Sequence, residues 1–254
     1  MPTQRGGDSD MSNEFLQILG LALLPALGNF AGGLLAEGLR PSGAFLNRAL
    51  HAATGVILAI ISVEVMPEAL GTAPAWLLAL AFFGGGCAYL LLETAVDRWQ
   101  QSKQTGAGTG AWMVYAAVTT DLLGDGLLIG AGAAVSTHLA LFLALGQVLA
   151  DVPEGFAVIA NFRAKGVSRA RRLLLAASFV VPVMATAALA YVALRGQQDA
   201  VQMTALVFVA GLFILAAVED MLSEAHETAE DSRWSALSLI AGFALFLAVS
   251  NGLG

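Results

Sequence analysis

The sequence predicts an all-α, polytopic membrane protein built as a bundle of eight transmembrane helices. The hydrophobic fraction is 57% and the charged fraction is 12%, whereas about 25% of the residues of a soluble domain are charged. The mean hydropathy is +0.75. Apolar stretches near the length of about 20 residues that crosses a bilayer recur along the whole chain.

The spans follow from these apolar stretches. The polar segment 1–13 predicts a disordered N-terminal tail, and residues 14–254 predict a single transmembrane domain. The first and the sixth span each run for 22 residues without a charge. The eight predicted spans are 15–36, 49–70, 76–92, 111–135, 139–161, 173–194, 200–218 and 234–254.

The basic residues predict the orientation of the bundle. Ten of the twelve lysines and arginines fall in loops on one side of an eight-span bundle, which leaves Arg5 and Arg195 on the other side. The positive-inside rule places the basic side in the cytoplasm, so both termini are expected outside. The composition, rich in alanine, leucine and glycine, favours a bacterial inner membrane.

Four acidic residues lie in the middle of the fourth and fifth spans. They form two pairs, Asp121 with Asp125 and Asp151 with Glu154. A charge near the bilayer centre costs about 2.5–3.5 kcal/mol per residue, so such residues mark functional sites. The spacings of four and three residues place each pair on one face of its helix. We expect the two faces to meet at one depth, because residues 136–138 leave only a short turn between the spans.

Both segments also contain residues that break helices. Pro153 lies between the second pair of acids, and Gly124 and Gly126 flank Asp125. The two segments match weakly when they are aligned on their glycines, and such a repeat is typical of the binding site of a transporter. The sequence therefore predicts that helices 4 and 5 are interrupted at this depth.

A buried structural network of protonated acids is the alternative to a cation site. No lysine or arginine lies within either apolar span to neutralise the four carboxylates. Carboxylates that converge without a partner repel one another strongly, which favours a cation between them.

Further acids lie nearer the ends of the second and seventh spans. Glu64 and Glu68 share a helix face at the outer end, which indicates an entry region. A second set at the inner end indicates an exit region. In both places the alternative is interfacial residues in water. The inner set is Asp220, Glu224, His226 and Glu227.

The chain resembles the ZIP family (Zrt-/Irt-like proteins) of divalent-metal transporters, as a divergent bacterial member. The stretches DVPEGFAV and DLLGDGLLIG are similar to the family's fifth and fourth helices. Residues 51–70 resemble the second helix, and residues 216–245 resemble the seventh and eighth. The resemblance implies import of a metal ion into the cytoplasm, with Asp121, Asp125, Asp151 and Glu154 as ligands.

The departures from the family bear on the metal. Ala150, Leu122 and Val181 stand where the family usually has residues able to ligate. Because Leu122 and Val181 cannot bind a metal, the sequence does not decide whether the family's second, adjacent metal site exists here. Carboxylate ligands suit Mn²⁺ and other hard cations, whereas imidazole and thiolate suit Zn²⁺. We therefore expect weak selectivity for zinc among Zn²⁺, Mn²⁺, Fe²⁺, Co²⁺ and Cd²⁺, and no prosthetic group.

Three other functions stay open at this point. They are a proton-coupled carrier of another substrate, a non-transporting metal sensor, and an intramembrane metal enzyme. The enzyme is the least favoured, because the HExxH motif and a nucleophile with a paired base are both missing. A single cysteine, Cys87, excludes a disulfide framework. The sequence predicts the bilayer and a divalent ion as partners and no nucleic acid, and leaves a homodimer open.

Overall fold

The computed structural model describes residues 5–39, 42–102, 109–229 and 232–253. This part of the chain is all-helical and contains eight helical spans that are long and apolar enough to cross a membrane. The eight predicted spans are confirmed. Most of them extend beyond the predicted ends, and the seventh extends furthest, to Glu227.

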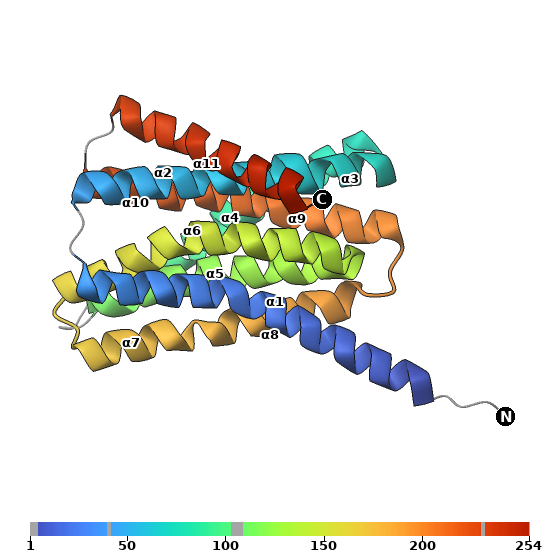
Figure 1. Ribbon diagram of the computed structural model, residues 1–254, viewed down its shortest axis with the longest axis horizontal. Coiled ribbons are helices and arrows are strands. Elements are labelled where there is room, and N and C mark those ends of the chain that lie inside the picture. The colour runs from blue at the N-terminus through green and yellow to red at the C-terminus, as the bar shows by residue number, and fades with distance from the viewer. Residues whose placement is uncertain (1–4, 40–41, 103–108, 230–231, 254) are drawn as a thin grey trace.

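The eight spans consist of eleven α-helices and two π-helical segments, because three of the spans are divided. The second span is α2, η1 and α3, the sixth is α7 and α8, and the seventh is α9, η2 and α10 (Figure 1). The bounds are α1 Arg5–Gly38, α2 Gly43–Ala59, η1 Ile60–Val65, α3 Met66–Thr72, α4 Ala75–Ser102, α5 Thr109–Val135, α6 Thr137–Ala164, α7 Arg169–Ser178, α8 Val180–Leu194, α9 Asp199–Ala216, η2 Ala217–Met221, α10 Leu222–Thr228 and α11 Arg233–Leu253.

The ends of the spans agree with the predicted loops. The ends of α1, α6 and α10 gather at one end of the bundle, at the left of Figure 1, together with the starts of α2, α7 and α11. The turns that follow α3, α5 and α8 lie at the other end, and so do both termini. The end at the left carries Arg163, Arg169 and Arg233, so it is the basic end.

The prediction that helices 4 and 5 are interrupted is wrong. Both α5 and α6 run as continuous α-helices past the acidic residues, and α6 contains Pro153 inside it. A proline inside a helix removes one backbone hydrogen bond and crowds the carbonyl four residues earlier, and close packing against a neighbouring helix can keep the helix continuous in spite of this. Here the backbone of α1 at Gly32 lies against that of Val152. Irregular geometry occurs instead in the second and seventh spans, at η1 and η2.

The first helix begins at Arg5, so residues 5–13, which the sequence analysis placed in a disordered tail, are helical in the structure. Adding residues to the end of a formed helix requires no new nucleus. This explains why the polar segment continues the apolar span that follows it.

Glycines determine which helices lie closest together. In each of four helix pairs a glycine leaves no room for a side chain, because the backbone of the partner helix stands where a methyl group would be. Small residues of this kind allow helices in a membrane to approach closely. The pairs are α1 with α6, α5 with α8, α2 with α11 and α4 with α9, at Gly32, Gly126, Gly55 and Gly85 respectively. Gly126 thus serves packing and does not loosen α5.

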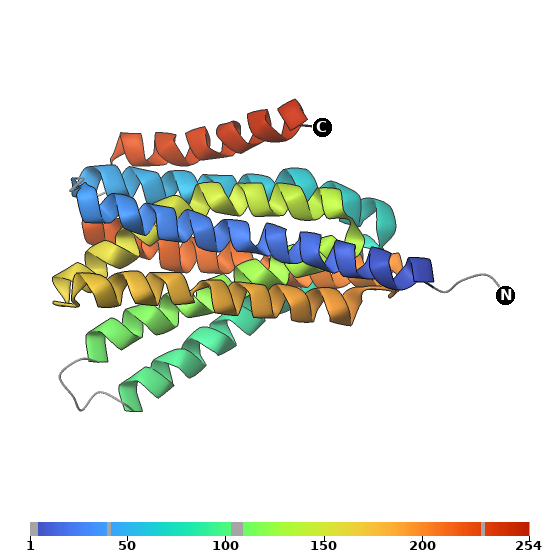
Figure 2. The same cartoon turned by 60° about the horizontal axis from the view of Figure 1, so that its bottom comes forward.

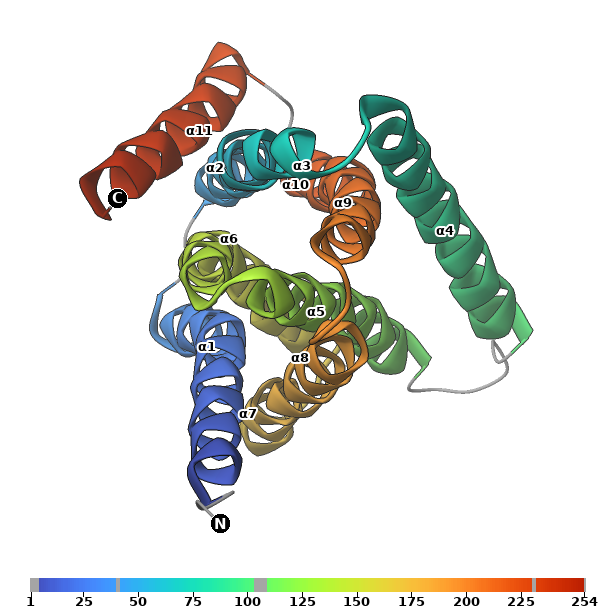
Figure 3. The same cartoon turned by 90° about the vertical axis from the view of Figure 1, so that its right-hand side faces the viewer.

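These pairs form two groups of helices. One group contains α1, α5, α6, α7 and α8, and the other contains the remaining helices (Figure 3). Two glycines at the boundary between the groups contact side chains of the other group and not its backbone. Gly124 contacts Phe213, and Gly146 contacts Ile60 and Phe246. The helices α5 and α6 lie in the middle of the bundle, with helices of both groups around them.

The helices α4 and α11 lie at the periphery, on opposite sides of the bundle (Figure 2). In the apolar 18-residue stretch of each helix only 17% of the residues are buried inside the protein, so most of their large apolar side chains face outward. Cys87 is exposed on α4 for the same reason.

A buried ion pair fastens the basic end of the first group. Arg172 on α7 binds the carboxylate of Glu37 on α1 with two hydrogen bonds, of 2.7 and 2.8 Å. Arg163 and Arg169 approach the same carboxylate at 3.5 and 3.6 Å. A bidentate arginine–carboxylate pair has a defined geometry as well as a favourable charge interaction. The ion pairs of Glu37 therefore connect α1 to the end of α6 and the start of α7.

Candidate metal site

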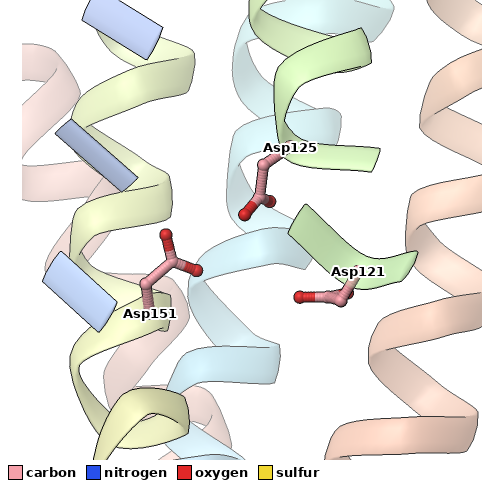
Figure 4. Close-up of side chains that lie close together, drawn as sticks. All are labelled: Asp121, Asp125 and Asp151. Atoms are coloured by element: carbon pink, nitrogen blue, oxygen red, sulfur yellow. The ribbon is translucent and has the colours of Figure 1, made fainter. Parts of the chain in front are cut away.

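Three aspartates from two helices meet in the centre of the bundle. Asp121 and Asp125 on α5 and Asp151 on α6 point toward one another (Figure 4). One carboxylate oxygen from each lies within 4.8 Å of the others. Oxygens on opposite sides of a divalent ion lie about 4–5 Å apart, twice the usual metal–oxygen distance. The three aspartates therefore have the spacing of a single divalent-cation site.

The turn between α5 and α6 sets this geometry. Ser136 caps the N-terminus of α6, and its side chain accepts a hydrogen bond of 3.1 Å from the backbone N–H of Leu139. The cap reverses the chain within one residue, so α5 and α6 lie antiparallel and in contact. The two acid-bearing faces meet at one depth, as the sequence predicts.

Glu154 extends the group toward the basic end. Asp121, Asp151, Asp125 and Glu224 all interact electrostatically with its carboxylate. Asp125 and Asp151 are at most 1% exposed, and Glu154 is 6% exposed. One oxygen each of Asp125, Asp151 and Glu154 is buried and has no hydrogen-bond donor among the described residues. Buried polar atoms are rarely left without a partner, so this arrangement suits a cation or its bound water.

Two buried amides belong to the same part of the bundle, and the sequence analysis did not identify either of them. Gln147 on α6 donates a hydrogen bond of 2.9 Å from Nε2 to Oδ1 of Asp125. Asn29 on α1 is 1% exposed, and its backbone carbonyl lies against Gly155. Gln147 could have been identified from the sequence, because it is a polar residue within an apolar span and lies four residues before Asp151. Asn29 carried a weaker signal.

An acidic cavity leads away from the site. It has a volume of about 320 Å³ and is lined by Asp121 and Glu154 at one end and by Glu224 and Glu227 at the other. Asn161 of α6 donates a hydrogen bond of 2.8 Å to Oε1 of Glu224. Since Glu224 and Glu227 belong to α10, the cavity extends toward the basic end of the bundle. Glu93 of α4 also lines it, and the sequence analysis did not include this residue.

Of the two further residues predicted for the inner region, His226 and Asp220, the first is not among the described residues that line this cavity. His226 is exposed, and its ring meets that of His51 edge-on, with the ring centres 6.1 Å apart. The side chain of Asp220 lies outside the part of the chain that the structure describes.

The structure does not bring Glu64 and Glu68 to the aspartates. Glu64 accepts a hydrogen bond from Ser250 of α11, and Glu68 is exposed. On α6, five residues before Asp151, Gly146 packs against Ile60 and Phe246. Apolar side chains therefore pack against α6 on the side of the aspartates away from the acidic cavity.

The fold and the site together define a class of protein: a multi-pass helical membrane protein with a buried carboxylate cluster at its centre. No model of a known protein family matches the chain, and no characterised protein matches it either.

Proposed function

We propose that this protein is a divalent-metal transporter that imports its ion into the cytoplasm, in the manner of the ZIP family. The ion binds between α5 and α6, at Asp121, Asp125, Asp151 and Glu154. It is the transported substrate, taken from Zn²⁺, Mn²⁺, Fe²⁺, Co²⁺ and Cd²⁺. The protein resides in a cell inner membrane with both termini outside.

The observation that carries this proposal is the spacing of the three aspartates. Their oxygens lie within 4.8 Å of one another in the middle of a membrane-length bundle. A structural network of ionised carboxylates would need hydrogen-bond donors for them. Apart from Gln147, the hydrogen bonds identified for the described residues supply no donor to Asp125. A divalent cation satisfies several carboxylates at once.

The shape of the bundle supports the direction of transport. The acidic cavity is lined by Asp121 and Glu154 and reaches α10 near the basic end, whereas Ile60 and Phe246 pack against Gly146 of α6 in the other direction. Excess lysine and arginine mark the cytoplasmic side of a membrane protein. An ion at the site therefore has a polar route to the cytoplasm in this conformation.

Uptake by liposomes that contain the purified protein tests the proposal. We expect saturable uptake of at least one of Zn²⁺, Cd²⁺, Mn²⁺, Fe²⁺ and Co²⁺, with weak preference for zinc over manganese in competition. A folded protein that takes up none of these ions contradicts the proposal. Flux driven by pH without bound metal would indicate a proton-coupled carrier, and metal binding without flux would indicate a sensor.

The route predicts a distinct effect for Glu224→Gln. This carboxylate lines the cavity and accepts a hydrogen bond from Asn161, but it lies outside the group of three aspartates. We expect the maximum uptake rate to fall several-fold while the affinity measured by equilibrium binding stays near that of the wild type. An equal loss of affinity and rate would place Glu224 in the binding site itself.

A further inference from the structure

Gln147 is an amide that hydrogen-bonds directly to one of the aspartates. It lies on α6, four residues before Asp151, and is fully buried. Its Nε2 donates to Oδ1 of Asp125, across from α6 to α5. A fully buried glutamine in an apolar span is costly unless both ends of its amide have partners.

The oxygen of this amide has no such partner. An ionised carboxylate only accepts hydrogen bonds, so Gln147 must turn its NH₂ group toward Asp125 and its oxygen away from Oδ1. That oxygen, Oε1, is buried and has no hydrogen-bond donor among the described residues. Covalent geometry keeps it within about 2.3 Å of Nε2, and therefore within about 5 Å of the Asp125 carboxylate.

We propose that Oε1 of Gln147 is a neutral ligand of the same cation that Asp121, Asp125 and Asp151 hold. The inference rests on the proposed function and adds a residue that sets the specificity of the site. The NH₂ group of the amide orients Asp125, and the carbonyl oxygen of the amide completes the coordination. Oδ2 of Asp125 is likewise buried and has no hydrogen-bond donor among the described residues.

A neutral oxygen ligand favours a hard cation with six ligands over zinc. Zn²⁺ is satisfied by four ligands, whereas Mn²⁺ takes about six oxygens in octahedral geometry. The carboxylates of the cluster suffice for the four ligands of Zn²⁺, whereas the amide oxygen of Gln147 helps to complete the six ligands of Mn²⁺.

Metal binding to the full-length protein in detergent, measured by titration calorimetry with Mn²⁺ and with Zn²⁺, tests the inference. For Gln147→Leu we expect the Kd for Mn²⁺ to rise about 10- to 100-fold, and the Kd for Zn²⁺ to rise less. For Gln147→Glu, which keeps an oxygen at this position but cannot donate to Asp125, we expect Mn²⁺ binding to be largely retained.

The two variants separate ligation from a merely structural role. If Gln147 acts only by donating to Asp125, the glutamate variant loses Mn²⁺ binding as fully as the leucine variant, and the inference is overturned. It is overturned equally if Gln147→Leu binds both ions as the wild type does. Failure of the wild type to bind either ion would instead contradict the proposed function.

Gln202→Leu is the matched control. Gln202 is a second buried glutamine, on α9. Its Nε2 donates a hydrogen bond of 3.0 Å to the backbone oxygen of Leu194, near the end of the bundle opposite the basic end. Its loss should change neither Kd. Thermal unfolding of each variant verifies that the proteins compared are folded.

Discussion

Asp125→Asn is expected to abolish metal uptake. The substitution keeps the shape of the side chain but removes the charge from the most deeply buried acid of the cluster. The attraction between a carboxylate and a divalent ion is strong where water is excluded. Losing an outer-shell partner of a metal costs 10- to 100-fold in affinity, so losing a direct ligand, the role proposed for Asp125, should cost at least about 100-fold. Liposome uptake and equilibrium binding, measured with the same ion, provide the readout.

Asp199→Asn is the control for this experiment. Asp199 is an exposed acid in the first turn of α9, at the end of the bundle away from the acidic cavity. Its neutralisation changes net charge by the same amount but should leave uptake unchanged. Wild-type uptake by the Asp125 variant would show that the aspartate cluster is not the transport site.

The second large effect is on stability. Gly32→Ala is expected to destabilise the protein severely, because an alanine methyl group at this position would overlap the backbone carbonyl of Val152. The obstructing atoms belong to the backbone of α6 and not to a flexible side chain that could move aside, so α1 would have to separate from α6. Overpacking of this kind costs typically about 1–3 kcal/mol, and more where backbone must shift. Thermal unfolding in detergent should show a marked decrease in Tm or a failure to accumulate folded protein.

Gly20→Ala, in the same helix, provides the comparison. No atom stands within 4 Å of the position that its methyl group would occupy. Alanine also favours a helix over glycine by about 1 kcal/mol, so this variant should be as stable as the wild type or slightly more so. If both variants unfold alike, the close approach of α1 to α6 does not contribute to stability as the structure indicates.

Much of the fold follows from local sequence properties. Each span is uncharged or nearly so over about 20 residues, and this alone dictates a helix across a bilayer, because the backbone has no water to bond with. The spacing of Asp121 and Asp125 likewise sets their common face through the period of the α-helix. These predictions needed no knowledge of neighbouring helices.

The predictions that failed concerned how neighbouring helices respond. Pro153 and Gly124 favour an interruption when each helix is considered alone. In the bundle α1 packs against α6 at Val152, and Phe213 of α9 fills the space beside Gly124. Nothing in the local pattern at 60–65 or 217–221 indicated the π-helical segments that occur there.

The sequence by itself determined the eight spans, the basic end and the depth of the four acids, because these depend on hydropathy and on the helical period. Only the tertiary structure decided which oxygens converge: three aspartates within 4.8 Å, with Glu154 at the mouth of the acidic cavity and Gln147 bonded to Asp125. Such contacts depend on the rotation and separation of whole helices. Glycines fix these through backbone contacts between segments as distant in sequence as Gly32 and Val152.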